Sequence, residues 1–119
     1  MNEKLTNETN ALTGTMQTLG FRIKHLMADT KRDCAQLQRR AARLLNADGL
    51  LDAYEAAFLP QDITKINETM AETKAAVEAL RTLRWIGKEM HGIDAPAFER
   101  ITGLNSETFA PITAQGGAS

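Results

Sequence analysis

The sequence predicts an all-α fold, an elongated antiparallel hairpin of two long helices with short flanking helices and coiled-coil-like packing. Three observations predict it. Apolar residues recur every three or four positions in the first part of the chain, a second such seam follows in the middle, and the two segments carry opposite charge. Only 5% of the side chains are aromatic and alanine is frequent, which suits helices that pack closely.

The first long helix is expected from about Ala11 to Asn46, because an apolar side chain recurs at every turn. The ladder consists of Leu12, Met16, Leu19, Ile23, Leu26, Thr30, Cys34, Leu37, Ala41 and Leu44. A helix of that span is about 54 Å long at 1.5 Å per residue. Two consecutive steps of four around Thr30 indicate a stutter, which locally unwinds a left-handed supercoil. The ladder keeps its phase across Gly20, so the helix is expected to continue through this glycine.

The second long helix is expected to begin near Pro60, because the first turn of a helix tolerates proline, and to end at His91 and Gly92. Its buried seam is expected to consist of Ile63, Ile66, Met70, Val77, Leu80, Leu83, Ile86 and Met90. Residues 46–49 are expected to end the first helix, and a short amphipathic segment over residues 50–58 precedes the second.

A third, short helix is indicated by its capping residues. Asp94 is suited to the N-cap, Pro96 to the first turn and Gly103 to a left-handed C-cap. Together with the two long helices it completes a predicted helical domain over residues 14–104.

Both ends of the chain differ in composition from this domain. Residues 1–13 are rich in Asn and Thr, which compete for backbone hydrogen bonds, and they are predicted to form a flexible N-terminal arm, extended or frayed. Residues 105–119 are rich in Ser, Thr, Pro and Gly and are predicted to form a C-terminal tail, with Phe109 and Ile112 as its anchors.

Charge is divided between the two long segments. Residues 22–43 hold seven basic and two acidic side chains, a net charge of +5, whereas residues 44–79 hold seven acidic and two basic ones, a net charge of −5. An antiparallel hairpin lays these segments side by side, so the matching favours intramolecular folding. The alternative is that basic side chains of the first helix contact an anionic partner. Its candidates are Arg32, Arg39, Arg40 and Arg43.

No pattern in the chain is typical of an active site. His25, Asp29 and Asp33 are spaced one helical turn apart, but such a stripe is usually a solvated face, and no metal ligands are assigned. Cys34 lies on the apolar ladder and is expected to act as a small core residue. We therefore expect a protein that is not an enzyme, with no catalytic residues, no cofactor and no small-molecule substrate.

Trp85 is the side chain that points most directly to a binding surface. Packing against Phe98 or Ile101 of the last helix is the ordinary expectation for it. The functional alternative is an interface anchor, because Trp and Arg are frequent in binding hot spots. Its neighbours in such an interface are Arg81, Arg84 and Lys88. Two strips of small residues are further interface candidates, Ala28, Ala35 and Ala42 on the first helix and Ala71, Ala75 and Ala79 on the second.

These features predict a non-enzymatic structural or interaction protein that self-associates or joins a larger protein assembly, such as a viral, phage or secretion-machine component. Two alternatives stay open: an adaptor or inhibitor that binds one host protein, and a nucleic-acid-associated accessory protein that uses residues 32–43. The overall charge of −1 and the lack of aromatics in that stretch make nucleic acid the less favoured partner. No signal peptide or transmembrane segment is recognised, so a cytoplasmic or virion-associated location is expected.

Overall fold

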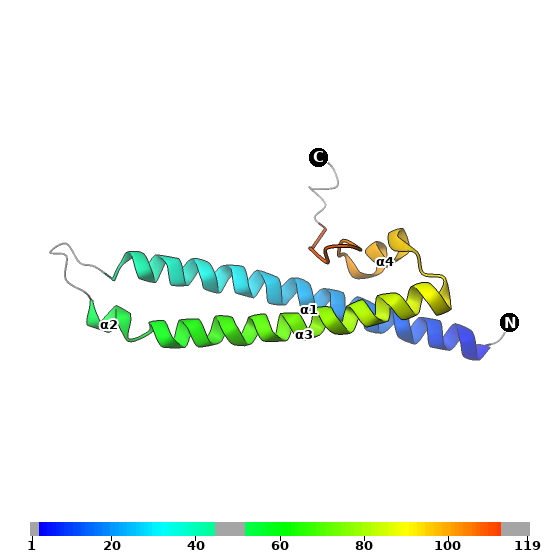
Figure 1. The fold of residues 1–119 in the computed structure, drawn as a ribbon, viewed down its shortest axis with the longest axis horizontal. Coiled ribbons are helices and arrows are strands. Elements are labelled where there is room, and N and C mark those ends of the chain that lie inside the picture. The colour runs from blue at the N-terminus through cyan, green and yellow to red at the C-terminus, as the bar shows by residue number, and fades with distance from the viewer. Residues whose placement is uncertain (1–2, 45–51, 113–119) are drawn as a thin grey trace. The chain divides into compact units, whose positions relative to one another are not determined.

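The structure, a computed structural model, describes residues 3–44 and 52–112 of the chain, and side chains from residue 7 onward. The described residues form four helices: α1 (Glu3–Ala42), α2 (Ala53–Ala56), α3 (Leu59–His91) and α4 (Ala95–Thr102). The long helices α1 and α3 run in opposite directions, as Figure 1 shows. This confirms the predicted all-α helical hairpin.

Helix α1 is longer at its N-terminus than the sequence suggested. It begins at Glu3, so the segment expected to be an extended or frayed arm is helical from there on. The hydroxyl groups of Thr13 and Thr15 donate to the carbonyl oxygens of Asn10 and Ala11, at 3.0 and 2.9 Å. Threonine therefore bonds back to its own helix here instead of breaking it.

The remaining helix boundaries follow local signals. Helix α1 continues through Gly20, as predicted, and ends at Ala42. Residues 46–49, which were expected to end it, lie outside the described residues. Helix α3 has Pro60 in its first turn and is followed by Gly92, whose φ of 68° is left-handed.

Helix α4 begins and ends as predicted. The side chain of Asp94 accepts a hydrogen bond from the backbone N–H of Ala97 at 2.9 Å, and Gly103 closes the helix with a φ of 73°. Each cap satisfies backbone groups that the helix itself leaves without partners. The residues that determine where α4 begins and ends all lie within one helical turn of those ends.

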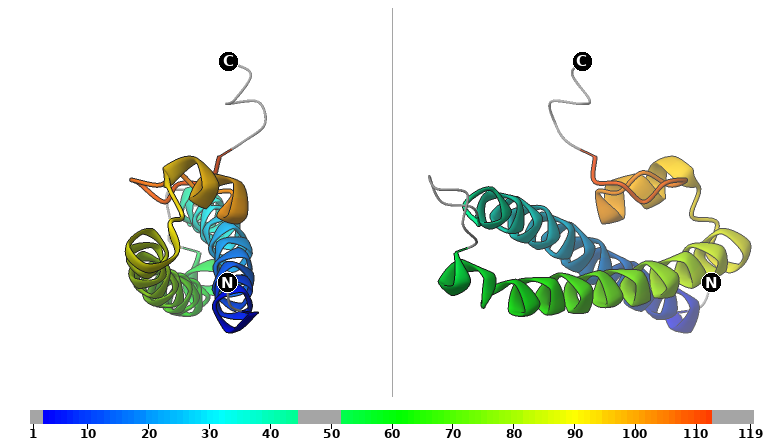
Figure 2. Two further views of the ribbon diagram at one scale, coloured as in Figure 1. Left: turned by 90° about the vertical axis from the view of Figure 1, so that its right-hand side faces the viewer. Right: turned by 60° about the vertical axis from the view of Figure 1, so that its left-hand side comes forward.

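The chain divides into two compact units. Unit 1 comprises Met1–Lys24 and Lys74–Ser119, and unit 2 comprises His25–Thr73. In unit 1, the first part of α1 packs with the last part of α3 and with α4, and Figure 2 shows α4 lying over the two long helices there. In unit 2, the last part of α1 packs with α2 and the first part of α3.

Unit 1 has the larger apolar core. Its buried side chains are Leu12, Met16, Ile23, Ala76, Leu80, Ile93, Phe98, Leu104 and Phe109. Gly20 lies where α4 ends: a Cβ atom there would be 2.5 Å from the carbonyl oxygen of Thr102. This glycine is thus a point of close packing and not a bend.

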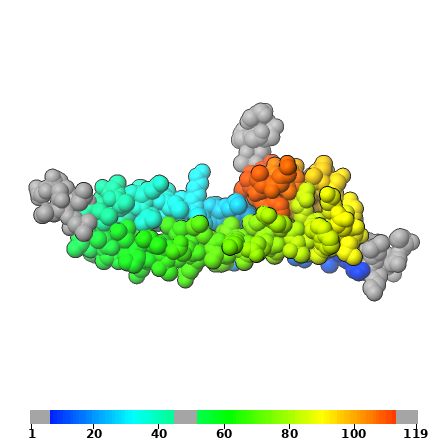
Figure 3. Space-filling view, in the orientation of Figure 1, coloured from blue at the N-terminus to red at the C-terminus, as the bar shows by residue number. Residues whose placement is uncertain are grey.

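Residues 104–112 fold back on themselves after α4. Leu104 and Pro111 form an antiparallel bridge, and the backbone N–H of Asn105 donates to the carbonyl oxygen of Ala110 at 2.8 Å. Phe109 has a φ of 61°, a left-handed conformation that is strained for a bulky residue. The residue is only 3% exposed, so its side chain is part of the core. Figure 3 shows this segment in orange, seated on α3. Part of the expected tail therefore belongs to the packed body of unit 1, with Phe109 as its anchor.

The seam of α1 in unit 2 differs from the predicted ladder. After Leu26 and Thr30 it continues through Asp33, which is only 6% exposed, and then through Arg40, whereas Ala41 is exposed. Cys34 and Leu37, two positions of the predicted ladder, are part-buried beside them. Apolar periodicity missed this register because two of the inward-facing side chains are charged.

The seam of α3 also differs from the prediction. Its buried and part-buried positions recur with alternating steps of three and four: Leu59, Asp62, Ile66, Thr69 and Thr73 in unit 2, and Ala76, Leu80, Leu83 and Gly87 in unit 1. Three residues assigned to the seam, Ile63, Met70 and Met90, are instead 48%, 53% and 68% exposed. The true seam is rich in small and threonine side chains, so hydrophobicity alone did not reveal it.

Ion pairs explain how unit 2 accommodates charge in its seam. Arg40 Nε lies 2.7 Å from Asp62 Oδ2, and Arg40 Nη1 lies 2.9 Å from Glu55 Oε2. The guanidinium also lies over the Phe58 ring, 4.9 Å from its centroid. The hydrogen bond with Asp62 raises the pKa of Arg40. These contacts join the basic segment to the acidic one, as the charge pattern predicted.

Candidate functional site

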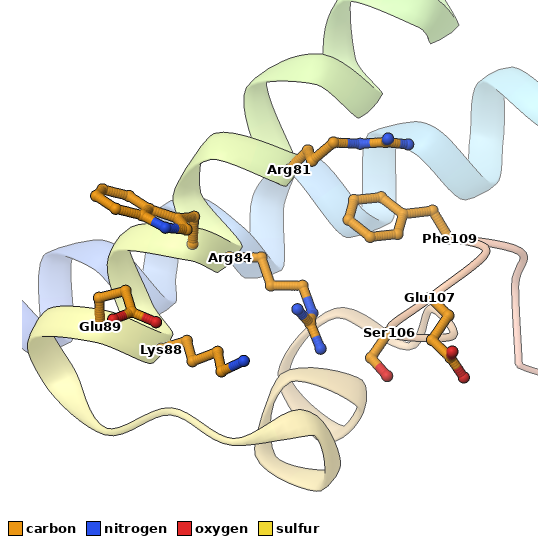
Figure 4. A pocket seen from close by; sticks show the side chains of 8 residues that line it. Arg81, Arg84, Lys88, Glu89, Ser106, Glu107 and Phe109 are labelled. Carbon is orange, nitrogen blue, oxygen red and sulfur yellow. The ribbon is translucent and has the colours of Figure 1, made fainter.

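One concave surface of unit 1 combines aromatic and charged side chains. We call it the Trp85 pocket, a cavity of about 300 Å³. Its lining residues are Arg81, Arg84, Trp85, Lys88, Glu89, Ser106, Glu107 and Phe109. Figure 4 shows Arg81, Arg84 and Lys88 extending from α3 towards the turn that carries Ser106 and Phe109.

The helical repeat of α3 gathers the basic side chains of the pocket. Arg84 and Trp85 each lie three or four residues from Arg81 and from Lys88, so the four positions cluster on one side of the helix. The opposite wall is the turn after α4, where the Ser106 N–H donates to Glu99 Oε2 at 2.9 Å. Helix and turn meet only because α4 returns the chain to α3.

Two arginines of the pocket lie against buried aromatic rings. Arg84 Cζ is 5.4 Å from the centroid of Phe98, and Arg81 Cζ is 5.4 Å from the centroid of Phe109. The two rings contact each other, with centroids 5.4 Å apart and planes inclined at 40°. Both rings are almost fully buried, so each guanidinium group caps one side of an aromatic pair.

The cations of the pocket have no carboxylate partner among the described residues. Neither Arg81, Arg84 nor Lys88 forms an ion pair within 4.0 Å, although Glu89 and Glu107 line the same cavity. The Arg84 Nε atom is buried and has no hydrogen-bond acceptor. A buried N–H group without an acceptor is costly.

The expected packing of Trp85 on the last helix is wrong, because this side chain is 62% exposed. Phe98 is covered by Arg84 instead. Besides the Trp85 pocket, the indole also lines a second, shallower hollow of about 440 Å³ with Glu78, Arg81 and Thr82. The tryptophan thus stands between two hollows on the surface of unit 1.

Sequence reasoning identified the basic and aromatic side chains of the helical wall but missed Glu89 of the same helix and the whole opposite wall. Arg81, Arg84, Trp85 and Lys88 were grouped by spacing, and the structure brings them together. The contributions of Ser106, Glu107 and the Phe109 ring come from a segment without periodicity, so no local signal placed them beside α3.

The alanine strips are exposed for the most part. Ala28 and Ala42 face solvent and Ala35 is part-buried on α1, while Ala71, Ala75 and Ala79 are exposed on α3. They form no contact surface among the described residues, and their role at an interface stays a prediction.

The four arginines suggested as contacts for an anionic partner do not form one free patch. Arg40 is held by Asp62 and Glu55, Arg43 lies 3.6 Å from Glu55, and Arg32 lies 3.2 Å from Asp29. Arg39 is exposed. Carboxylates of unit 2 already neutralise most of this basic stretch.

His25, Asp29 and Asp33 were expected to form a solvated stripe, but they do not all face solvent. Asp33 is buried, its Oδ1 atom lies 3.7 Å from Lys65 Nζ, and its Oδ2 atom has no hydrogen-bond partner. Within the ranges 3–44 and 52–112, no three His, Cys, Asp or Glu side chains are grouped so as to hold a metal ion. Cys34 is part-buried and free.

Comparisons with protein-family models, with curated proteins and with solved structures returned no match. The fold and the Trp85 pocket therefore define the chain at the level of class, an all-α helical hairpin protein with an arginine-rich aromatic pocket. In the described part of the chain, no helix has both the length and the apolar character needed to cross a bilayer.

Proposed function

We propose that this chain is a non-enzymatic helical interaction protein that joins a protein assembly through the Trp85 pocket. The observation that carries the proposal is the exposure of Trp85, 62%, beside arginines that form no ion pair with any described residue. Tryptophan and arginine are the side chains most enriched in binding hot spots. A large exposed indole beside unpaired cations is better suited to a contact surface than to solvent.

In this proposal the assembly forms either by self-association of the chain or by its binding to a different protein. Met70 and Ile63 of unit 2 are exposed apolar side chains that favour further contacts. The basic segment of unit 2 supports nucleic-acid binding less well, since Arg40 and Arg43 are already paired with acids.

Photo-crosslinking from position 85 tests the proposal. A photoreactive phenylalanine analogue replaces Trp85 in the chain produced in its own cells, and a matched variant carries it at Gln38, an exposed position of unit 2. We expect one adduct of discrete mass from position 85 and none from position 38, with the partner, or a second copy of the chain, identified by mass spectrometry. An equal spread of adducts from both positions, or none from position 85, would overturn the proposal.

Light scattering coupled to size-exclusion chromatography separates its two forms. A mass above that of one chain, lowered by Trp85→Ala without loss of helicity, identifies self-association. A monomeric mass together with a heterologous adduct identifies a different protein as the partner.

A further inference from the structure

We propose that the Trp85 pocket binds an acidic peptide segment of a protein partner, with carboxylates held by Arg81 and Arg84 and an adjacent apolar side chain packed on Trp85. The inference rests on the proposed function and specifies the chemistry of the partner. Four properties of the pocket carry it: the fixed orientation of its arginines, their lack of anionic partners, the exposed indole, and the acids at the rim.

The arginines are oriented before any ligand arrives. Phe98 and Phe109 are 0% and 3% exposed and contact each other, so the surfaces on which Arg84 and Arg81 lie are fixed by the core of unit 1. The cation–π contact keeps each guanidinium group beside its buried ring. Less side-chain entropy is then lost when a carboxylate binds, and the planar edge matches two carboxylate oxygens.

The pocket also lacks the anion that its cations would attract. Three cationic side chains line it against the carboxylates of Glu89 and Glu107, and no oppositely charged pair among them lies within 4.0 Å. The buried Nε of Arg84 still needs an acceptor. An incoming carboxylate supplies negative charge to the cations that line the pocket, which a neutral ligand does not.

Trp85 supplies the apolar part of the site. Its indole borders both the pocket and the shallower hollow with Glu78 and Thr82, so a segment that crosses it fills one hollow with an acidic side chain and the other with an apolar one. Covering a large aromatic side chain adds hydrophobic free energy to the charged contact. The combination favours an extended peptide over a free anion.

The rim favours a peptide over nucleic acid. Glu78, Glu89 and Glu107 lie around the two hollows and would repel a continuous phosphodiester chain, whereas a peptide carries its charges at separate positions. One exposed aromatic side chain is also a poor platform for successive stacked bases.

The test uses the full-length chain and a synthetic peptide, Gly-Ser-Glu-Leu-Asp-Glu-Leu-Asp-Gly-Ser. The protein contains one tryptophan, so its fluorescence reports on Trp85 directly. We expect a saturable blue shift of the emission that weakens with added salt. A matched peptide with Gln and Asn in place of Glu and Asp should bind at least about tenfold more weakly, because charge-assisted hydrogen bonds are roughly twice as strong as neutral ones.

Variants locate the binding. Arg84→Gln and Arg81→Gln should each reduce the affinity for the acidic peptide about tenfold, while Arg39→Gln, an exposed arginine of unit 2, should leave it unchanged. Thermal unfolding of each variant shows whether the fold is kept. Arg81 is exposed, so its variant tests the idea even if Arg84→Gln unfolds.

Three results would overturn the inference: no saturable shift with the acidic peptide, equal binding of the amide peptide, or tighter binding of a single-stranded oligonucleotide of the same charge. If a discrete adduct still forms from position 85, only the chemistry of the partner is wrong. If no adduct forms either, the proposed function falls with it.

Discussion

The guanidinium group of Arg84 lies over the ring of Phe98, with Cζ 5.4 Å from the ring centroid, and covers an aromatic side chain that is otherwise fully buried. Phe98 in turn contacts Phe109, and the guanidinium group of Arg81 lies over the Phe109 ring. The core of unit 1 therefore determines how these two arginines are presented at the surface.

Replacing Gly20 tests the close contact between α1 and the end of α4. We expect Gly20→Ala to lower the free energy of unfolding by about 1–3 kcal/mol, because the new methyl group overlaps the backbone of Thr102. Gly14→Ala is the matched control: no atom lies within 4 Å of a Cβ there, so higher helix propensity should stabilise the protein by up to about 1 kcal/mol. Urea denaturation followed by circular dichroism measures both, and stabilisation by Gly20→Ala would show that the contact is absent.

Removing Arg40 tests the ion-pair cluster of unit 2. Arg40→Ala leaves Asp62 without its cation and Glu55 with only the more distant, exposed Arg43, so the melting temperature should fall by several degrees more than for Arg39→Ala, an exposed arginine one position away. Differential scanning calorimetry measures the difference, and equal melting temperatures would contradict the cluster.

The same pair of variants has a defined pH dependence. The pKa of Arg40 is raised above its ordinary value by its hydrogen bond with Asp62, so its contribution is fully present at neutral pH and is lost only as a strongly alkaline pH rises through the folded-state pKa. The difference between Arg40→Ala and Arg39→Ala should therefore stay constant between about pH 6 and pH 9. A marked change over that range would show that another titrating group controls the cluster.

Replacing Asp33 with an apolar residue should stabilise unit 2. Its carboxylate is 6% exposed and one oxygen has no partner, whereas Lys65 and Arg32 are mostly exposed and lose little without it. We expect Asp33→Leu to raise the free energy of unfolding by about 1–3 kcal/mol, as when buried ion pairs are replaced by packed apolar groups. Asp29→Leu, at a more exposed position, should change it little. Chemical denaturation compares the two, and a loss of stability in Asp33→Leu alone would show that the pair is net favourable.

Phe109 should tolerate glycine better than alanine. Both substitutions remove the ring on which Arg81 lies, at a cost of about 3–5 kcal/mol. Its φ of 61° is left-handed, a conformation that costs about 1 kcal/mol for alanine and little for glycine. Phe109→Gly should therefore unfold at a higher urea concentration than Phe109→Ala, the reverse of the usual order for these residues. The usual order would show that the turn relaxes once the ring is gone.

The helices and their caps could be predicted because their causes are local. Asp94 and Gly103 cap α4 through atoms within one turn, and Pro60 marks the start of α3 in the same way. The basic face of α3 followed from spacing alone, so half of the Trp85 pocket was identified before the fold was known. Helix caps and the spacing of side chains along one helix depend on local geometry, so they do not change with what the helix packs against.

The helix registers and the second wall of the pocket have no local cause. Asp33 and Arg40 face inward because carboxylates and lysines from distant parts of the chain meet them, and Thr69 and Thr73 occupy the seam of α3 although their hydrophobicity is low. Phe109 joins Phe98 only after α4 has turned the chain back. Contacts between segments far apart in sequence stabilise these registers and this wall of the pocket. The periodicity within one helix therefore does not reveal them.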